Sequence, residues 1–283
     1  MPNRVATISN SLPTIAALCC SISLSCFTGC SDDPDFVVPE EIPQFAPEQK
    51  DLAETIVVEH EGVTIGPMLQ IAGQAAKPEK PGAMVSYSSP EEITEEFRDD
   101  IVEFNEIRPV VAFRFTTPRL SASDLELLRE LDDLTYLEID GTELDEEVID
   151  ILAELSELKQ LVISRSPNGD ELLGPLAQLT QLESITLAST EITGIGFKQF
   201  QQPSLLKSLS VHASPVTDEG LEAISQIKSL ESLVLIGTKI TDKSVPHLKK
   251  MRKLTYLNLQ DTEVSKNGFR SLRKALPKAR IFH

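Results

Sequence analysis

A repeat of 24 residues limits what this chain can fold into. With Ile227 as position 1, the unit that ends at Lys250 has apolar residues at positions 1, 4, 7, 9, 14, 19 and 22. Six further units fit the same frame, and position 7 is filled by Phe113, Leu137, Leu161, Ile185, Leu209, Leu233 and Leu257. A fixed period with several matched positions is typical of a stacked solenoid, in which no unit can bury its apolar side chains alone.

Each unit contains two different spacings. Positions 7 to 9 alternate apolar, variable and apolar, which predicts a short strand with one buried face. Positions 15 to 23 change to helical spacing, with apolar residues at positions 19 and 22. Position 15 carries side chains that cap helix N-termini, namely Ser121, Asp145, Thr193, Thr217, Thr241 and Ser265. We therefore expect strand, turn, helix and return in every unit, with all strands parallel.

The apolar pattern resembles the leucine-rich repeat family. The family motif L-x-x-L-x-x-L-x-L is matched by Leu131, Leu134, Leu137 and Ile139. The resemblance covers roughly residues 107–283 and implies an α/β solenoid, a right-handed horseshoe with a concave parallel β-sheet and convex helices. The 24-residue length is similar to that of ribonuclease-inhibitor-like repeats, and V-T-D-x-G-L at 216–221 resembles repeats of secreted bacterial proteins and of some ubiquitin-ligase adaptors.

Position 12 departs from the commonest pattern of that family. Many members have Asn there, whereas this chain has a hydroxyl residue in six units: Thr142, Ser166, Thr190, Ser214, Thr238 and Thr262. A hydroxyl can satisfy backbone groups at a turn. We expect the stacked units to form a ladder of these hydroxyls.

Residues 1–29 have the features of a secretory signal. Arg4 precedes an apolar, Ser-rich run, and no acidic residue occurs before Asp32. The run ends in Phe-Thr-Gly-Cys, which resembles the lipobox of bacterial lipoproteins. The resemblance implies cleavage before Cys30 and acylation of that residue, which would give an extracytoplasmic, membrane-anchored protein facing the periplasm or the cell surface. Plain secretion and an uncleaved anchor are the alternatives.

The segments between the signal and the repeats differ from one another. Residues 30–50 are acidic and Pro-rich, which predicts a disordered tether. Within residues 51–82, the β-rich runs of Thr55–Ile65 predict a small hairpin followed by a link. Residues 83–106 predict a degenerate N-terminal capping repeat with a helix at Glu91–Glu106. Residues 107–283 then supply seven units and an incomplete last one.

Composition excludes several classes of function. The net charge of −18 argues against a nucleic-acid partner. All four cysteines, Cys19, Cys20, Cys26 and Cys30, precede the repeats, so neither disulfides nor a cysteine-built metal site can hold them. The four histidines are far apart, and no nucleophile, phosphate-loop or dinucleotide motif is present. We therefore expect no cofactor and no metal site, and no enzyme unless residues 51–82 complete a catalytic site.

Positions 6, 8 and 10 are expected to project from the concave face, which the resemblance implies is the partner-binding surface. The candidate residues on and beside it are Tyr136, Glu138, Asp140, Val162, Arg165, His212, Val234, Ile236, Tyr256 and Asn258. Aromatic and apolar anchors dominate interface energies, so Tyr136, Val162, Val234, Ile236 and Tyr256 are predicted to be exposed and to contact a protein. Alternatively, these residues merely favour strand structure.

Two further features depart from the regular pattern. The segment Arg165–Asp170 has Asn168 at position 14, which predicts either a wider turn or a recognition loop. Charge is also uneven, because the helix predicted at Glu91–Glu106 is acidic and the region Lys243–Arg280 is strongly basic. These charges are either solvated surfaces, a contact for an anionic partner such as lipid head groups or glycan, or complementary ends for head-to-tail association.

Together these features predict a non-catalytic protein–protein interaction scaffold that is lipid-anchored outside the cytoplasm. One alternative is a module that binds cell-envelope polysaccharide, which the absence of Trp disfavours. The other is an intracellular adaptor similar to the ubiquitin-ligase repeats, which requires that the first 30 residues are no signal. The sequence leaves the identity of the partner and the oligomeric state open.

Overall fold

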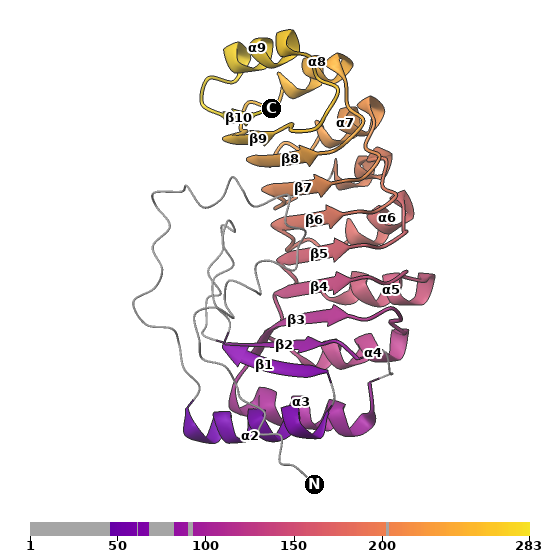
Figure 1. Ribbon diagram of the computed structural model, residues 1–283, viewed down its shortest axis with the longest axis vertical. Coiled ribbons are helices and arrows are strands. Elements are labelled where there is room, and N and C mark those ends of the chain that lie inside the picture. The colour runs from indigo at the N-terminus through magenta and orange to yellow at the C-terminus, as the bar shows by residue number, and fades with distance from the viewer. Residues whose placement is uncertain (1–45, 61, 68–81, 90–92, 202–203) are drawn as a thin grey trace.

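The computed structural model describes residues 46–283, except residues 61, 68–81, 90–92 and 202–203. The predicted signal, Cys30 and most of the predicted tether lie outside the described residues. The described chain forms one sheet of ten strands whose order in space is their order in sequence (Figure 1). The strands are β1 Val63–Pro67, β2 Ala83–Tyr87, β3 Val110–Thr116, β4 Tyr136–Asp140, β5 Gln160–Ser164, β6 Ser184–Ala188, β7 Ser208–His212, β8 Ser232–Ile236, β9 Tyr256–Asn258 and β10 Arg280–Phe282.

The register of the sheet follows the sequence period. From β3 to β9, equivalent residues of successive units pair in parallel, as Leu209 pairs with Leu233 and Leu233 with Leu257. Strand β2 pairs in parallel with β3 after a register shift, and β10 of the incomplete last unit pairs in parallel with β9. The prediction of parallel strands is therefore confirmed for the repeats. Among the strands of the described residues, only β1 is antiparallel to its neighbour, β2.

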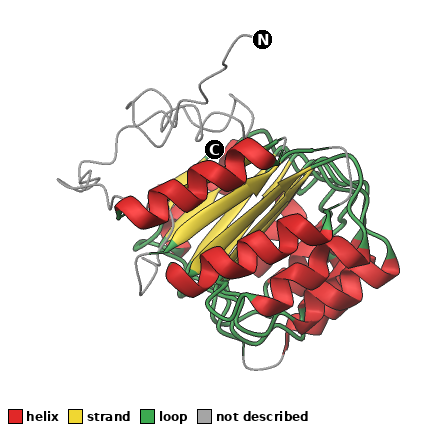
Figure 2. Cartoon of the chain, turned by 90° about the horizontal axis from the view of Figure 1, so that it is seen from below, coloured by secondary structure: helices red, strands yellow, loops and turns green. Residues whose placement is uncertain are grey.

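Helices of the repeats lie on one side of the sheet, and α2 and α3 lie together at the N-terminal end of the stack (Figures 1 and 2). The convex elements are short because each must return within one unit. The α-helices are α2 Pro47–Glu59, α3 Glu95–Ile107, α4 Ala122–Glu126, α5 Glu146–Glu154, α6 Leu173–Leu176, α7 Asp218–Ile224, α8 Val245–Leu248 and α9 Lys266–Ala275, and the 3₁₀ helices are η1 Leu127–Glu130, η2 Asp170–Leu172, η3 Ile195–Gln201 and η4 Asp242–Ser244.

The core is a continuous strip between the sheet and these helices. Positions 7 and 9 are fully or almost fully buried in every unit, as in Phe113, Leu209 and Leu235. Aliphatic side chains fill most of the strip, and most of the buried aromatic residues, Phe113 and Phe115 among them, lie near its N-terminal end. Since each layer contacts mainly the next one, the stability of this fold is expected to depend on the interfaces between units.

Strands β4 to β9 leave the sheet through a left-handed residue at position 11. Glycine occupies this position in two units, as Gly141 and Gly237 with φ of 85° and 66°. Four other units place a residue with a side chain there at φ between 46° and 55°: Arg165, Ser189, Ala213 and Asp261. The turn is retained because the position 11 N–H donates to a carbonyl of the next unit, as Ala213 N donates to Ile236 O at 2.9 Å.

Side chains at position 15 begin the convex helices as predicted. The hydroxyl or carboxylate of each accepts a hydrogen bond from a backbone N–H in the first turn at Ser121, Asp145, Thr217, Thr241 and Ser265. Among the described residues, no such cap bond is present at Thr193, whose hydroxyl donates to the Asp170 carboxylate of the preceding unit. The η3 helix of that unit begins only at Ile195.

Aspartates at position 16 join successive units, a feature that the sequence analysis missed. Asp218 accepts from Thr241 N at 2.9 Å and from Thr241 Oγ1 at 2.8 Å, and Ser244 Oγ also donates to it. Asp242 accepts in the same way from Ser265 N at 2.8 Å and Ser265 Oγ at 2.6 Å. Each carboxylate thus holds the turn of the following unit.

These bonds predict a dependence of stability on pH. Partial burial opposes ionisation of Asp218, but the hydrogen bonds from Ser244 and Thr241 outweigh burial and lower its pKa. The hydrogen bonds from Ser265 lower the pKa of Asp242. A carboxyl whose folded pKa is depressed stabilises the fold above its unfolded pKa of about 3.9 and loses that contribution as pH falls through the folded value. We therefore expect thermal stability to fall below about pH 4.

The test compares the melting temperature of Asp218→Asn with that of the unchanged protein at neutral pH and at pH near 3. The variant is expected to melt lower at neutral pH, and the difference is expected to shrink in acid. Glu219→Gln is the matched control, since Glu219 is the next residue and is exposed. A difference that stays constant with pH would show that the Asp218 charge is not what stabilises the turn.

The hydroxyls of position 12 do not form a continuous ladder among the described units. Five of the six are buried, but most satisfy carbonyls of their own turn: Thr238 Oγ1 donates to Leu235 O and Thr262 Oγ1 to Leu259 O. Only Thr190 and Ser214 are hydrogen-bonded to each other, at 3.0 Å. The predicted ladder is wrong because the nearest carbonyl lies within the same turn and competes successfully for the hydroxyl proton.

The segment Arg165–Asp170 joins two units by side-chain hydrogen bonds. In three other units, those of Glu191, Lys239 and Glu263, the position 13 N–H donates to the position 14 carbonyl of the preceding unit. Pro167 occupies position 13 here and has no N–H. The Asn168 side chain replaces the missing backbone donor: its Nδ2 donates to Leu144 O, and its Oδ1 accepts from Leu144 N, both at 2.8 Å. Asn168 is buried and therefore stabilises the fold rather than presenting a contact surface.

The N-terminal segment corrects the predicted hairpin at Thr55–Ile65. Its first half belongs to helix α2, which begins at Pro47 and so also includes the end of the predicted tether. Ala53 and Ile56, one turn apart, are buried, and Pro47 and Gln49 occupy favourable positions in the first turn. Only Val63–Pro67 forms a strand, and β1 pairs with β2 instead of with Thr55–Glu59. Burial of one helical face thus overrides the β propensity of Ile56 and Val57.

Candidate functional site

The candidate site is the face of the sheet opposite the repeat helices, the predicted concave face. Its side chains come from positions 6, 8 and 10, which alternate with the core positions along every strand. Neighbouring strands place equivalent side chains side by side, as Thr186, Ser210 and Val234 lie in one row across β6, β7 and β8. The N-terminal half of this face (β2–β5) and its C-terminal half (β6–β9) have different chemistry.

The N-terminal half is closed by its own side chains. Tyr136 and Val162 are only 4% and 5% exposed, and they form a second apolar cluster with Met84 and Ala112. The prediction that Tyr136 and Val162 are exposed is therefore wrong. Alternation along a strand predicts which face a side chain occupies, but here the side chains of neighbouring strands, about 4.8 Å away, cover one another.

A buried ion pair completes this closed half. Arg114 contacts Glu138 through Nε at 2.7 Å and Nη2 at 2.6 Å, and the Tyr136 hydroxyl donates to the same carboxylate at 2.8 Å. Glu138 is only 3% exposed. Burial opposes the Arg114 charge, but Glu138 outweighs burial and raises the pKa of Arg114. Burial, followed by the Glu138 charge, raises the pKa of Tyr136 well above its usual value. These polar groups satisfy one another.

Asp140 and Arg165 lie at the edge of the same half. Asp140 Oδ1 accepts hydrogen bonds from Ser164 Oγ and Arg165 Nε, both at 2.7 Å. The hydrogen bond to Asp140 is the main cause that raises the pKa of Arg165. The Arg165 side chain is 62% exposed, so this pair is expected to contribute little to stability. Arg165 remains accessible to a partner.

The C-terminal half presents apolar side chains that are only partly covered. Val234 and Ile236 are two residues apart on β8 and are half-buried, as are His212 on β7 and Tyr256 on β9. Small serines surround them, with Ser184, Ser208 and Ser232 in one row of the sheet and Ser210 in the next. The structure thus brings together four of the predicted candidates, His212, Val234, Ile236 and Tyr256, on adjacent strands.

Some polar side chains of the C-terminal half already form hydrogen bonds with one another. His212 Nε2 and Ser210 Oγ are 2.5 Å apart, and burial lowers the pKa of His212, which favours its neutral form. The Tyr256 ring packs on Phe282 with centroids 5.3 Å apart. Asn258 is buried and bonds with Gln260, so it is a poorer candidate for partner contact than its position predicted.

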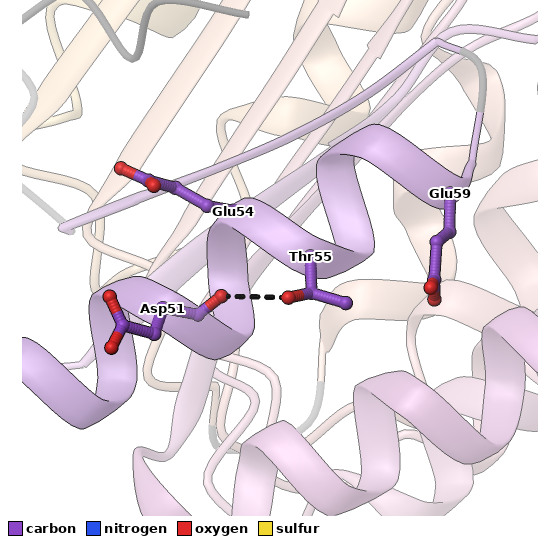
Figure 3. Close-up of a pocket in the computed structure, with 4 residues that line it drawn as sticks. All are labelled: Asp51, Glu54, Thr55 and Glu59. Atoms are coloured by element: carbon purple, nitrogen blue, oxygen red, sulfur yellow. Dashed lines mark hydrogen bonds between the residues drawn. The ribbon is translucent and has the colours of Figure 1, made fainter.

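Other surface features lie away from this face. Asp51, Glu54, Thr55 and Glu59 of α2 line an open depression of about 320 Å³ (Figure 3). At the opposite end of the stack, the basic residues of α9 and its surroundings are exposed, including Lys266, Arg270 and Arg273. Contact of the basic end with an anionic partner stays a prediction. Within the described residues, no helix is both long enough and apolar enough to cross a membrane.

The parallel strands in 24-residue register and the one-sided helices form a leucine-rich repeat fold, so the predicted α/β solenoid is confirmed. Comparisons with models of protein families and with curated protein sequences find no match. Among solved structures, the chain is similar to internalin C2 of Listeria monocytogenes, with 20% identity and a TM-score of 0.47 over 70% of this chain and 80% of that one.

Two further solved structures are similar in the same way. An internalin of Listeria monocytogenes has 14% identity and a TM-score of 0.38, over 70% of this chain and 72% of that chain. A leucine-rich repeat protein of Leptospira interrogans has 17% identity and a TM-score of 0.45, over 68% of this chain and 52% of that chain. At these values the function has to be argued from the residues of this chain itself.

Proposed function

We propose that this chain is a non-catalytic scaffold that binds a protein through the C-terminal half of its concave face. One observation carries the proposal: Val234, Ile236 and Tyr256 stand partly exposed on two adjacent strands of a rigid sheet, next to half-buried His212. Apolar and aromatic anchors of this kind supply most of the binding energy in protein interfaces. The surrounding serines leave room for the side chains of a partner.

The contrast with the N-terminal half supports this assignment. There, Tyr136 and Val162 are covered and the Arg114–Glu138 pair is satisfied internally. A partner would gain little by contacting groups that are already buried and paired. Arg165, exposed on the turn after β5, lies between the two halves and is proposed as a polar contact at the rim.

The location of the protein is proposed from its N-terminal sequence. A signal over residues 1–29, acylation of Cys30 and a Pro-rich tether would hold the repeats outside the cytoplasm at a membrane surface. A tether of this composition separates the scaffold from the bilayer. The proposed partner is therefore an extracytoplasmic protein, either of the envelope or of the surroundings.

The test places a photo-reactive phenylalanine analogue at Val234 in the full-length protein. A specific cross-linked protein is expected from Val234, whereas the same analogue at Glu222 on the exposed side of α7 is expected to give none. An excess of competitor protein that carries both Val234→Lys and Ile236→Lys should leave the cross-link intact. The same excess of protein without these substitutions should abolish the cross-link. Equal cross-linking from both positions would contradict a binding site on this face.

Fractionation of the same cells tests the location. Intact-mass measurement is expected to show a mature chain that begins at an acylated Cys30 in the membrane fraction, and Cys30→Ala is expected to leave that fraction. An unprocessed chain in the cytosol would contradict export and favour the intracellular adaptor. A glycan bound on the concave face, with no cross-linked protein, would favour the polysaccharide module instead.

A further inference from the structure

Three potential metal ligands lie together where α2 meets α3. The two helices run antiparallel, since Gln49 of α2 contacts the Ile107 carbonyl and His60, at the end of α2, contacts Asp100. His60 Nε2 and Asp100 Oδ2 are 2.7 Å apart, and a ligand atom of Glu59 lies within 4.8 Å of both. We propose that Glu59, His60 and Asp100 bind a divalent transition-metal ion of the zinc type.

The geometry of the three side chains is close to what such an ion needs. In a tetrahedral zinc site with bonds of about 2.0–2.2 Å, ligand atoms are roughly 3.4 Å apart. His60 and Asp100 would separate by about 0.7 Å and Glu59 would move inward. Glu59 is exposed at the C-terminal end of α2 and projects from it (Figure 3), so its side chain can rotate without disturbing the core.

The imidazole is already held in one orientation. The His60 ring packs edge-on against Phe97 with centroids 5.1 Å apart, and Phe97, which is buried, packs in turn on Tyr87. The His60 side chain is 11% exposed and that of Asp100 is 25% exposed. His60 is held by packing, Asp100 is already in contact with it, and Glu59 is free to close on the ion, so the site has little to reorganise.

Charge around the site favours a cation. The C-terminus of α2 carries the negative end of the helix dipole, and its last turn holds no Lys or Arg. Glu59 also lines the acidic depression with Asp51 and Glu54. Among the described residues, no ion pair of Glu59 is present to neutralise it. A cation bound at Glu59, His60 and Asp100 would supply that charge and join the two helices of the N-terminal end.

One imidazole nitrogen with two carboxylates selects among metals. Zinc and similar transition-metal ions accept mixed nitrogen and oxygen ligands, whereas calcium and magnesium prefer oxygen ligands in larger number. We therefore expect zinc to bind and calcium to bind far more weakly. The sequence predicted no metal site, because His60 and Asp100 are 40 residues apart and belong to no ligand motif.

The test is calorimetric titration of the metal-free, full-length protein with zinc chloride after alkylation of its cysteines. Alkylation removes competing thiols, since all four cysteines lie within the first 30 residues. One equivalent of zinc is expected to bind and to raise the melting temperature. His60→Ala, Asp100→Asn and Glu59→Gln are each expected to weaken binding by about tenfold or more, as loss of even an outer partner of a metal ligand costs about 10–100-fold.

Glu54→Gln is the matched control, because Glu54 lies on the same helix and lines the same depression but is outside the three ligands. It should bind zinc as the unchanged protein does. Glu59→Gln keeps the test decisive if the other two variants fold poorly, since Glu59 is exposed. Absence of binding at millimolar zinc would overturn the proposal, and so would unchanged affinity in the three variants. The result is independent of the protein-binding function proposed for the concave face.

Discussion

Asn168→Leu is expected to lower the free energy of unfolding by about 2–4 kcal/mol, although it restores an aliphatic residue at a position where the other units have one. The variant leaves both Leu144 N–H and Leu144 C=O without the partner they have in Asn168. Each buried polar group left unpaired costs about 1–3 kcal/mol. The Ser166 hydroxyl, which donates to Asn168 Oδ1 at 2.7 Å, also loses its acceptor.

A second substitution tests the cause. Pro167→Glu restores a backbone N–H at position 13. The equivalent residue of the next unit, Glu191, uses this N–H to donate a hydrogen bond to Asn168 O. Alone it should be neutral or slightly destabilising, because it gives up the rigidity of proline while Asn168 still satisfies Leu144. In the Asn168→Leu background it should instead recover about 1 kcal/mol or more, since the Leu144 carbonyl regains a donor.

Urea unfolding followed by circular dichroism measures all four proteins of this cycle. The expected signature is a change of sign in the effect of Pro167→Glu between the two backgrounds, which a general loosening of the turn would not produce. If Asn168→Leu is as stable as the unchanged protein, the two Leu144 hydrogen bonds do not stabilise this interface between units.

The repeat region illustrates why the fold could be predicted from the sequence. The core positions recur every 24 residues, so Leu209, Leu233 and Leu257 are independent evidence for the same buried position of the repeat. A misread residue in one unit therefore does not change the predicted fold, because the other units show the same pattern. The segment before the repeats has no such redundancy, and Thr55–Ile65 was predicted from local β propensity alone. The buried side of α2 faces residues distant in sequence, such as those of α3, which local propensity does not include.

The candidate site was predicted only in part, for a related physical reason. Alternation assigned Tyr136, Val162 and Val234 to the same face, and the sheet places them there. Whether each is exposed depends on its neighbours across strands: Tyr136 and Val162 lie beside Met84 and Ala112, whereas Val234 lies beside Ser210. His60 and Asp100 meet only because α2 packs on α3, so no spacing along the chain could have predicted them.

The Arg114–Glu138 pair gives the second large expected effect. Glu138→Leu is expected to cost about 3–5 kcal/mol, because it leaves the partly buried Arg114 guanidinium without its counter-charge. The Tyr136 hydroxyl loses its acceptor in the same variant. Tyr136→Phe is the matched comparison: it removes one hydrogen bond and leaves the ion pair, so it should cost only about 1 kcal/mol.

The double variant Arg114→Met, Glu138→Leu separates the worth of the pair from the cost of breaking it. Replacing both charges by apolar residues of similar size is often neutral or stabilising, so the double variant should be far more stable than Glu138→Leu alone. Urea unfolding measures the stability, and cross-linking from Val234 measures binding. Because the N-terminal half of the face is closed, the stable double variant should still cross-link to the partner. Loss of cross-linking in a folded double variant would extend the binding surface to β3 and β4.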